Sequence, residues 1–358
     1  MYRAALFIKR AGGKTFQRVN DSCARPHSAP RRHIAVFARA AKQMINMFRA
    51  KSAVNVRVFA PGPYVMNPYD VKDFSFKLFK YFMVWELLRQ VLLRVARWLI
   101  PAPKDDKEKD VRRFFPKQIT GAVHAAIVAV HAAIILRWMV ALAPEDQYYV
   151  RAGGHGLTTS QRDFVEHTWW LFMGYLVQDT THMVIQYPNL GKMDMMIHHV
   201  VFCVAAVLAG STQTMTLPFS WLLLGEASTP ILTVRWCIQS ASMTMKSEKV
   251  ITVAKALGYK GAAVSSVHNA GKALEFLNGV CLIITFFLVR IVVYSIGYPH
   301  MIWAWRTGIL SPVPDAVCSA VSGLVGIGAL LNMHWFSIMI GKAMKGPPKL
   351  EKSAGAKS

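Results

Sequence analysis

Long apolar stretches dominate the pattern of hydrophobic and polar positions along the chain. Six of them reach about the 20 residues that an α-helix needs to cross a lipid bilayer. They cover residues 119–143, 164–187, 195–213, 216–240, 277–298 and 315–340, the third being the shortest. A membrane β-barrel would instead show alternating segments of roughly ten residues. The pattern therefore predicts an all-α, polytopic membrane protein with six transmembrane helices.

The segment before the first span, residues 74–99, has a different pattern. Its apolar residues recur at three- and four-residue steps, which places them on one helical stripe: Phe74, Leu78, Tyr81, Trp85, Leu88, Leu92, Val95 and Leu99. Its charged residues are mostly basic. A basic face opposite an aromatic-rich stripe is typical of an amphipathic helix that lies in the membrane interface. An ordinary helix docked on the inner face of the bundle is the alternative.

The composition agrees with a membrane protein. Apolar residues make up 53% of the chain and charged residues 17%, against about 25% charged residues in soluble globular proteins. This composition excludes disorder over most of the length and, despite the net charge of +23, argues against a nucleic-acid binder. The five cysteines are scattered singly, so no zinc site or disulfide framework is expected.

Positive charge is distributed unevenly over the loops between the six spans. If the spans alternate in direction, one side receives 17 Lys and Arg residues and the other side 3. The richer side holds segments 101–118, 188–194, 241–276 and 341–358. Cytoplasmic or matrix loops carry such an excess of basic residues, so we expect both termini on the inner face.

The chain divides into four regions by composition. Residues 1–60 hold 13 Lys and Arg but only one acid, Asp21, which is typical of a mitochondrial transit peptide; a basic arm attracted to anionic lipid is the alternative. Residues 61–118 form a linker with the amphipathic helix, residues 119–345 the transmembrane domain, and residues 346–358 a basic tail. The mitochondrial inner membrane is therefore the expected location, with the endoplasmic reticulum as the alternative.

Ionisable residues inside the spans are the candidate catalytic groups, because charges at membrane depth are costly and are usually functional or paired. They are Asp179, Asp194, His198 and His199. A carboxylate that holds one imidazole nitrogen leaves the other as a general base or nucleophile. Asp194 is one helical turn from His198, whereas Asp179 would reach His199 from a neighbouring helix. A metal site is disfavoured because adjacent histidines on a helix point about 100° apart.

A second set of polar residues in the spans is suited to a lipid head group. By depth, most of these side chains converge on the inner half of the bundle, which predicts a pocket open to the basic face with Glu226 towards its floor. The candidate lipid-binding residues are Glu226, Arg235, Asn278, Arg290, Asn332 and Trp335. The alternative for both sets is a hydrogen-bonded plug that fixes helix packing.

Five motifs carry a family resemblance. They are GYLVQD ending at Asp179, DMMIHH ending at His199, GEASTP followed by Arg235-Trp236, Asn278-Gly279 with FFLVRI around Arg290, and Asn332-x-x-Trp335. This ordered set resembles the TLC domain of ceramide synthases and translocation-associated membrane proteins.

The resemblance implies membrane helices around a central cavity that opens to the basic side. In ceramide synthases the matching histidine pair is catalytic for acyl transfer, with acyl-CoA as co-substrate. The segment 200–210, VVFCVAAVLAG, departs from the synthase motif, and the chain is closer to the non-synthase TLC-domain proteins.

Two functions follow from these observations, and the sequence leaves open whether the protein is an enzyme. The first is a lipid-handling membrane protein that binds an acyl chain or phospholipid in its cavity, with His-dependent acyl transfer as the expected chemistry. The second is a non-catalytic accessory subunit of a mitochondrial inner-membrane complex of respiratory or ATP synthase type. Membrane lipids, cardiolipin among them, and subunits of such a complex are the expected partners; no cofactor is expected.

Overall fold

The computed structural model describes residues 71–100, 111–144, 146–149, 156–187, 193–245, 261–311 and 313–344. The arm of residues 1–60 and the tail of residues 346–358 lie outside these ranges, so the transit peptide and the basic tail stay predictions.

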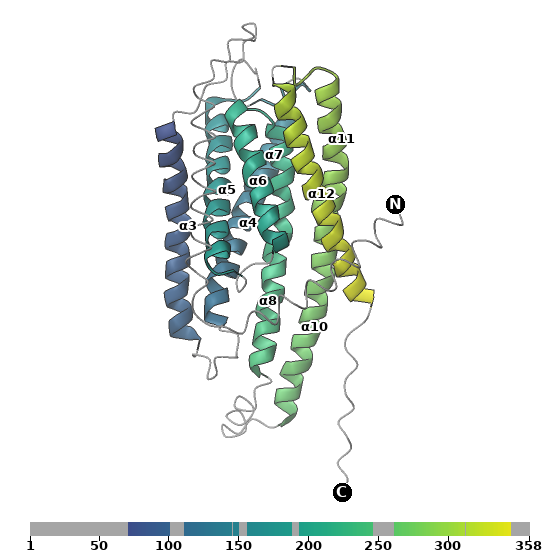
Figure 1. The fold of residues 1–358 in the computed structure, drawn as a ribbon. Helices are drawn as coiled ribbons and strands as arrows, with labels where there is room; N and C mark the ends of the chain where they lie inside the picture. The colour runs from purple at the N-terminus through teal and green to yellow at the C-terminus, as the bar shows by residue number, and fades with distance from the viewer. Residues whose placement is uncertain are drawn as a thin grey trace, which may run out of the picture.

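The described residues form an elongated bundle of helices (Figure 1). In chain order the elements are α3 (Val71–Leu99), α4 (Val111–Val140), α5 (Thr159–Ile185), α6 (Met193–Thr212), α7 (Thr216–Leu224), the 3-10 helix η2 (Gly225–Ala227), α8 (Ser228–Met245), α10 (Gly261–Phe286), the π-helix η3 (Phe287–Val292), α11 (Val293–Arg306) and α12 (Asp315–Met344). The only β-type pairing among the described residues is an isolated bridge between Tyr149 and Thr214. The predicted all-α class is confirmed.

Four helical segments of the described chain are long and apolar enough to cross a membrane. They are Val111–Val140, Met193–Gly210, Gly271–Arg306 and Asp315–Met344, and they coincide with four of the six predicted spans. The predicted span 164–187 corresponds to α5, which carries Glu166 and Asp179. The predicted span 216–240 is divided between α7, η2 and α8, so no single long apolar helix covers it.

Helices α5 and α6 run in opposite directions. Trp169 contacts Ala206 and Thr180 contacts His199, so α5 and α6 are antiparallel. The last residues of α5, α8 and α12 therefore lie at one end of the bundle, which we call the basic end because the Lys- and Arg-rich segments of the sequence join helices there. It is the lower end in Figure 1. We call the other end the outer end.

The outer end is filled by a large apolar core. Tyr148 and Tyr149, from the connection between α4 and α5, are buried among the ends of the helices, and their hydroxyls bond to His300 and to the Ile309 carbonyl. The amides of Thr216 and Leu217 donate to the backbone of the same connection. The interior at this end is therefore mainly apolar, with a few buried polar groups such as Thr216 and Ser220.

Helix α3 does not lie across an end of the bundle. It runs lengthwise beside α5 (Figure 1), and its contacts progress in the same direction along both helices: Lys77 with Glu166, Tyr81 with His167, and Trp85 with the Leu171 carbonyl. The helix predicted over 74–99 is confirmed as α3, and its interfacial position stays a prediction. The apolar stripe of α3 packs against protein: Phe74 and Tyr81 contact Trp170 of α5, and Trp85 contacts Tyr175 of α5 and His124 of α4.

Candidate functional site

The histidine pair lies in the first turns of α6, near the basic end, and both side chains are buried. His199 Nδ1 is 3.7 Å from Asp179 Oδ2 and 3.3 Å from the Thr180 hydroxyl. Lys117 Nζ lies 3.9 Å from the same Asp179 oxygen. Asp179 thus stands between a cation from α4 and an imidazole from α6. Of the two carboxylate–histidine pairs that the sequence left open, the structure brings this one together.

His198 has different surroundings. Its ring packs against Phe202 and Trp335, with ring centroids 4.5 Å and 5.2 Å apart, and its Nδ1 is buried with no hydrogen-bond partner in the described part of the chain. Asp194 accepts a hydrogen bond from Trp335 Nε1 at 3.2 Å instead of holding His198. Asp194 and Trp335 therefore act together in joining α6 to α12.

A second polar cluster surrounds Arg290, in the π-helix η3. Each guanidinium nitrogen has a partner: Nε donates to the Gly225 carbonyl and Ser228 Oγ, Nη1 to Asn332 Oδ1 at 3.2 Å, and Nη2 to Glu226 Oε1 at 3.1 Å. Arg290, Glu226 and Asn332 are among the residues that the sequence predicted to bind a lipid head group. The structure brings them together as one network that ties η3 to η2 and α12.

Two irregular helical segments make this network possible. The 3-10 helix η2 places Glu226 towards η3, and the π-helix turns Arg290 back towards η2. A π-helix widens the turn and so re-aims a side chain, which is why such segments occur at functional sites. A Cβ at Gly225 would lie 3.5 Å from the Arg290 side chain, which is ordinary van der Waals contact.

Arg235 and Asn278 join α8 to α10, apart from the histidine pair. Arg235 Nη1 donates to the Glu275 carbonyl at 3.2 Å, and Asn278 Nδ2 donates to the Ile231 carbonyl at 3.2 Å. Arg235 Nη1 would lie 2.6 Å from a Cβ at Gly279, so the glycine makes room for it. Arg235 is 32% exposed, and it remains open to a head group on this side of the bundle.

Three residues near the histidine pair were not predicted as site residues. Lys117 approaches Asp179, and His124 stacks on Tyr175 with ring centroids 3.8 Å apart. His124 is 1% exposed and neither ring nitrogen has a partner among the described residues. His124 could have been predicted as a site residue, because it is an ionisable residue within the first apolar stretch. Nothing in the sequence distinguishes Tyr175 or Lys117 as site residues.

The two polar clusters are neighbours. His198 packs against Trp335 of α12, and Asn332, one turn earlier in the same helix, accepts a hydrogen bond from Arg290. The buried nitrogens of His124, His198 and Asn332 that lack a partner in the described chain are spread over the same region. Buried polar atoms normally have a partner, so this region is suited to a polar ligand or to ordered water.

Residues 115–341 match the family model of the TLC domain. Searches of curated proteins and of solved structures give no match. The matched segment starts in the first turns of α4 and ends in the last turns of α12. It therefore includes every residue of the two polar clusters and leaves α3 outside.

Proposed function

The chain belongs to the TLC-domain family, and we propose that it binds a lipid between its helices at the basic end and transfers or removes an acyl group there. The matched domain and the apolar helices make it an integral membrane protein of a lipid-related family. The observation that carries the proposal is the buried arrangement of Lys117, Asp179 and His199.

Asp179 is suited to orient His199. A carboxylate beside Nδ1 favours the tautomer that carries its proton there, which leaves Nε2 as a base. In acyl transfer, His199 Nε2 would take the proton of an attacking hydroxyl or amine while the new ester or amide bond forms. The same proton would then pass to the departing thiolate of acyl-CoA. Lys117 would add positive charge near the entrance, where the phosphates of acyl-CoA would lie.

The proposed cavity lies between the helices and opens to the basic end. In this proposal the bundle has six spans, of which α5 is one and the consecutive helices α7, η2 and α8 together form another. Two side chains support it. Lys117 and Glu226 keep 17% and 21% exposure although each pairs with a residue of another element inside the bundle. The outer end is filled by the core around Tyr148 and Tyr149, so accessible space among the helices would open towards the basic end.

Replacement of the histidines tests this function. We expect His198→Ala/His199→Ala to lose most of the lipid that copurifies with the wild-type protein, measured by mass spectrometry of lipid extracts. His334→Ala is the matched control, because His334 is an exposed histidine of α12, and its lipid content should equal that of the wild type. An unchanged lipid profile in the folded double variant would refute the proposal.

The alternative is a non-catalytic accessory subunit of a mitochondrial inner-membrane complex. It is favoured by the complete internal pairing of Arg290 and by the packing of His198 between two aromatic rings, since both serve helix packing. Blue-native electrophoresis of native membranes distinguishes the two functions. Migration within a large complex supports the subunit, and migration as a single small protein–detergent particle contradicts it.

A further inference from the structure

We propose that α3 is an additional transmembrane helix, held against α5 by a buried cluster around Glu86 and surrounded on its other side by lipid acyl chains. This helix precedes the segment that matches the TLC domain, and its charged residues keep it out of the four segments that are long and apolar enough to cross a membrane by length and composition. The proposal therefore rests on the contacts of those charged residues, and it does not depend on any acyl-transfer chemistry.

The side of α3 that faces the bundle is closely packed. Trp85 is 3% exposed and donates its indole N–H to the Leu171 carbonyl at 2.9 Å. A Cβ at Gly174 would lie 2.7 Å from the Tyr81 carbonyl carbon and 2.9 Å from the Phe82 nitrogen. The two backbones thus approach as closely as a glycine allows, which is a common way for membrane helices to associate.

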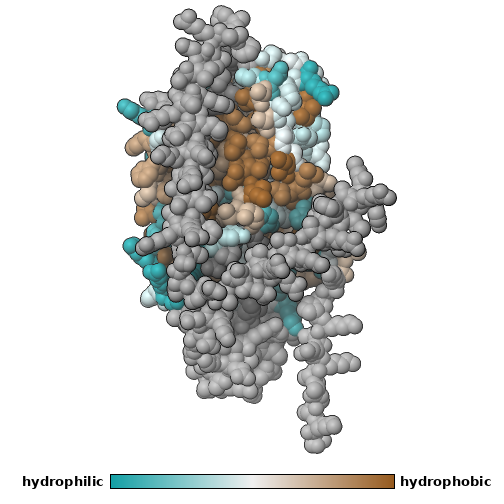
Figure 2. Space-filling view, viewed as in Figure 1, coloured by the Kyte–Doolittle hydropathy of each residue, from teal (hydrophilic) through white to brown (hydrophobic). Residues whose placement is uncertain are grey.

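The opposite side of α3 is mainly apolar in its middle. The exposed large apolar residues of this helix are Phe76, Phe79, Met83, Val84, Leu87, Val91, Val95 and Trp98. At 1.5 Å per residue they extend over about 33 Å, and the hydrocarbon core of a bilayer is about 30 Å thick. Lys80, Arg94 and Arg97 are also exposed within this length, and long basic side chains can extend from such positions to the polar boundary of the bilayer. Between Lys80 and Arg94, about 21 Å apart along the helix, no charged residue of α3 is exposed. Figure 2 shows that apolar residues also occupy the middle of the visible face of the molecule.

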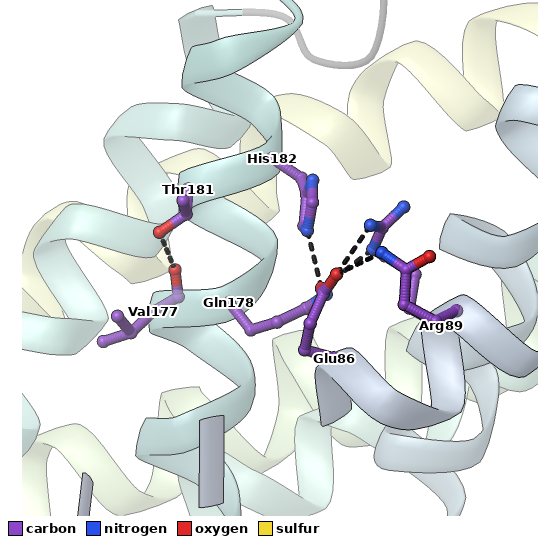
Figure 3. Close-up of polar contacts among 7 residues, drawn as sticks. Glu86, Arg89, Val177, Gln178, Thr181 and His182 are labelled. Carbon is purple, nitrogen blue, oxygen red and sulfur yellow. Dashed lines mark hydrogen bonds and ion pairs between the residues drawn. The ribbon is translucent and has the colours of Figure 1, made fainter. Parts of the chain in front are cut away.

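The charged residues in the middle of α3 turn inward and are neutralised. Figure 3 shows Glu86 facing Gln178 and His182 of α5, with Arg89 beside it. Arg89 donates to both Glu86 oxygens at 2.7 and 2.9 Å, and Gln178 and His182 approach Oε2 at 3.0 and 2.7 Å. A carboxylate with this many donors is what membrane depth requires, whereas a helix at the interface could leave it in water. The cluster therefore indicates that α3 is embedded in the bilayer.

The proposal has a topological consequence. Because α3 is parallel to α5, its first turn lies at the outer end, while α12 ends at the basic end. If only the six predicted helices cross the membrane, Lys72 at the start of α3 and Lys342 at the end of α12 lie on the same side. If α3 is a seventh transmembrane helix, these two residues lie on opposite sides.

Cysteine labelling tests this consequence on the full chain. Lys72→Cys, Ser160→Cys and Lys342→Cys are made separately, all three positions being exposed. Sealed vesicles that hold the protein in one orientation are treated with a membrane-impermeant maleimide, and labelled peptides are quantified by mass spectrometry. Because the peptides are resolved, the native cysteines stay in place.

We expect positions 72 and 160 to react alike and position 342 to react oppositely, with all three labelled after permeabilisation. Position 72 reacting together with position 342 would overturn the proposal. A photoreactive benzoylphenylalanine at Leu87, which is 64% exposed, tests the lipid contact separately. We expect adducts with phospholipid, and adducts with another protein would show that this face is a protein interface instead.

Discussion

At the scale of residues, the sequence predicted the polar positions better than their roles. Depth along the spans correctly brought Asp179 towards the histidine pair from another helix. The spacing of Asp194 and His198 on one helix suggested that these two residues pair, but the Trp335 indole of α12 donates a hydrogen bond to the Asp194 carboxylate instead. Partners from distant helices cannot be read from local spacing. Arg290 is the clearest case, since its partners come from η2, α8 and α12.

The Arg290 network gives a prediction for stability. Arg290→Met leaves the Glu226 carboxylate without its ion pair and the Asn332 amide without its donor. Breaking a buried ion pair costs about 3–5 kcal/mol, so we expect a large fall in the Tm of the detergent-solubilised protein.

Two controls define this result. Arg235→Met removes an arginine that is 32% exposed, and an exposed ion pair contributes about 0–1 kcal/mol. Glu226→Gln/Arg290→Met, which removes both charges, should recover part of the lost Tm. A single Arg290 variant as stable as the Arg235 variant would mean that the network does not support the fold.

At the scale of elements, two local features show what a pattern can and cannot predict. The predicted span 216–240 is interrupted by η2, which lies immediately before α8 and Pro230. Pro230 itself lies in the first turn of α8, where its missing N–H is not needed. The π-helix at 287–292 has no comparable signal, because no glycine or proline lies within it.

The contacts of α3 could not be predicted from its sequence for a physical reason. Its charged residues suggested water on one side of the helix, yet Glu86 and Arg89 satisfy each other and face α5. A one-dimensional pattern counts such residues as hydrophilic although their contacts neutralise them. The same pattern could not reveal that Gly174 of α5 admits the α3 backbone.

Gly174 provides a second prediction. We expect Gly174→Ala to separate α3 from α5 and to lower the Tm, because the added Cβ would stand 2.7 Å from the Tyr81 carbonyl carbon. Gly323→Ala is the matched control in α12, since nothing lies within 4 Å of the Cβ position there. Alanine favours a helix over glycine by about 1 kcal/mol, so the control should keep or raise the Tm. Equal behaviour of the two variants would contradict the close approach.

At the scale of the whole molecule, composition and the long apolar stretches were sufficient for the class and the family. Four of the six predicted spans are among the membrane-length apolar helices, and the TLC resemblance is confirmed over residues 115–341. The other two predicted spans, which correspond to α5 and to α7, η2 and α8, are not among them. Their polar residues lower the mean hydropathy, although these residues make contacts inside the bundle. The difference between the two ends, one polar and one apolar, became visible only when the connection that holds Tyr148 and Tyr149 was placed among the helices.

The buried tyrosines at the outer end set a limit on what the protein can do. With Tyr148 fully buried and Tyr149 5% exposed, the described residues of this connection are packed closely among the helix ends. In the proposed function, a lipid held among the helices would therefore enter and leave at the basic end or laterally through the bilayer. The protein would then alter the lipid for one compartment.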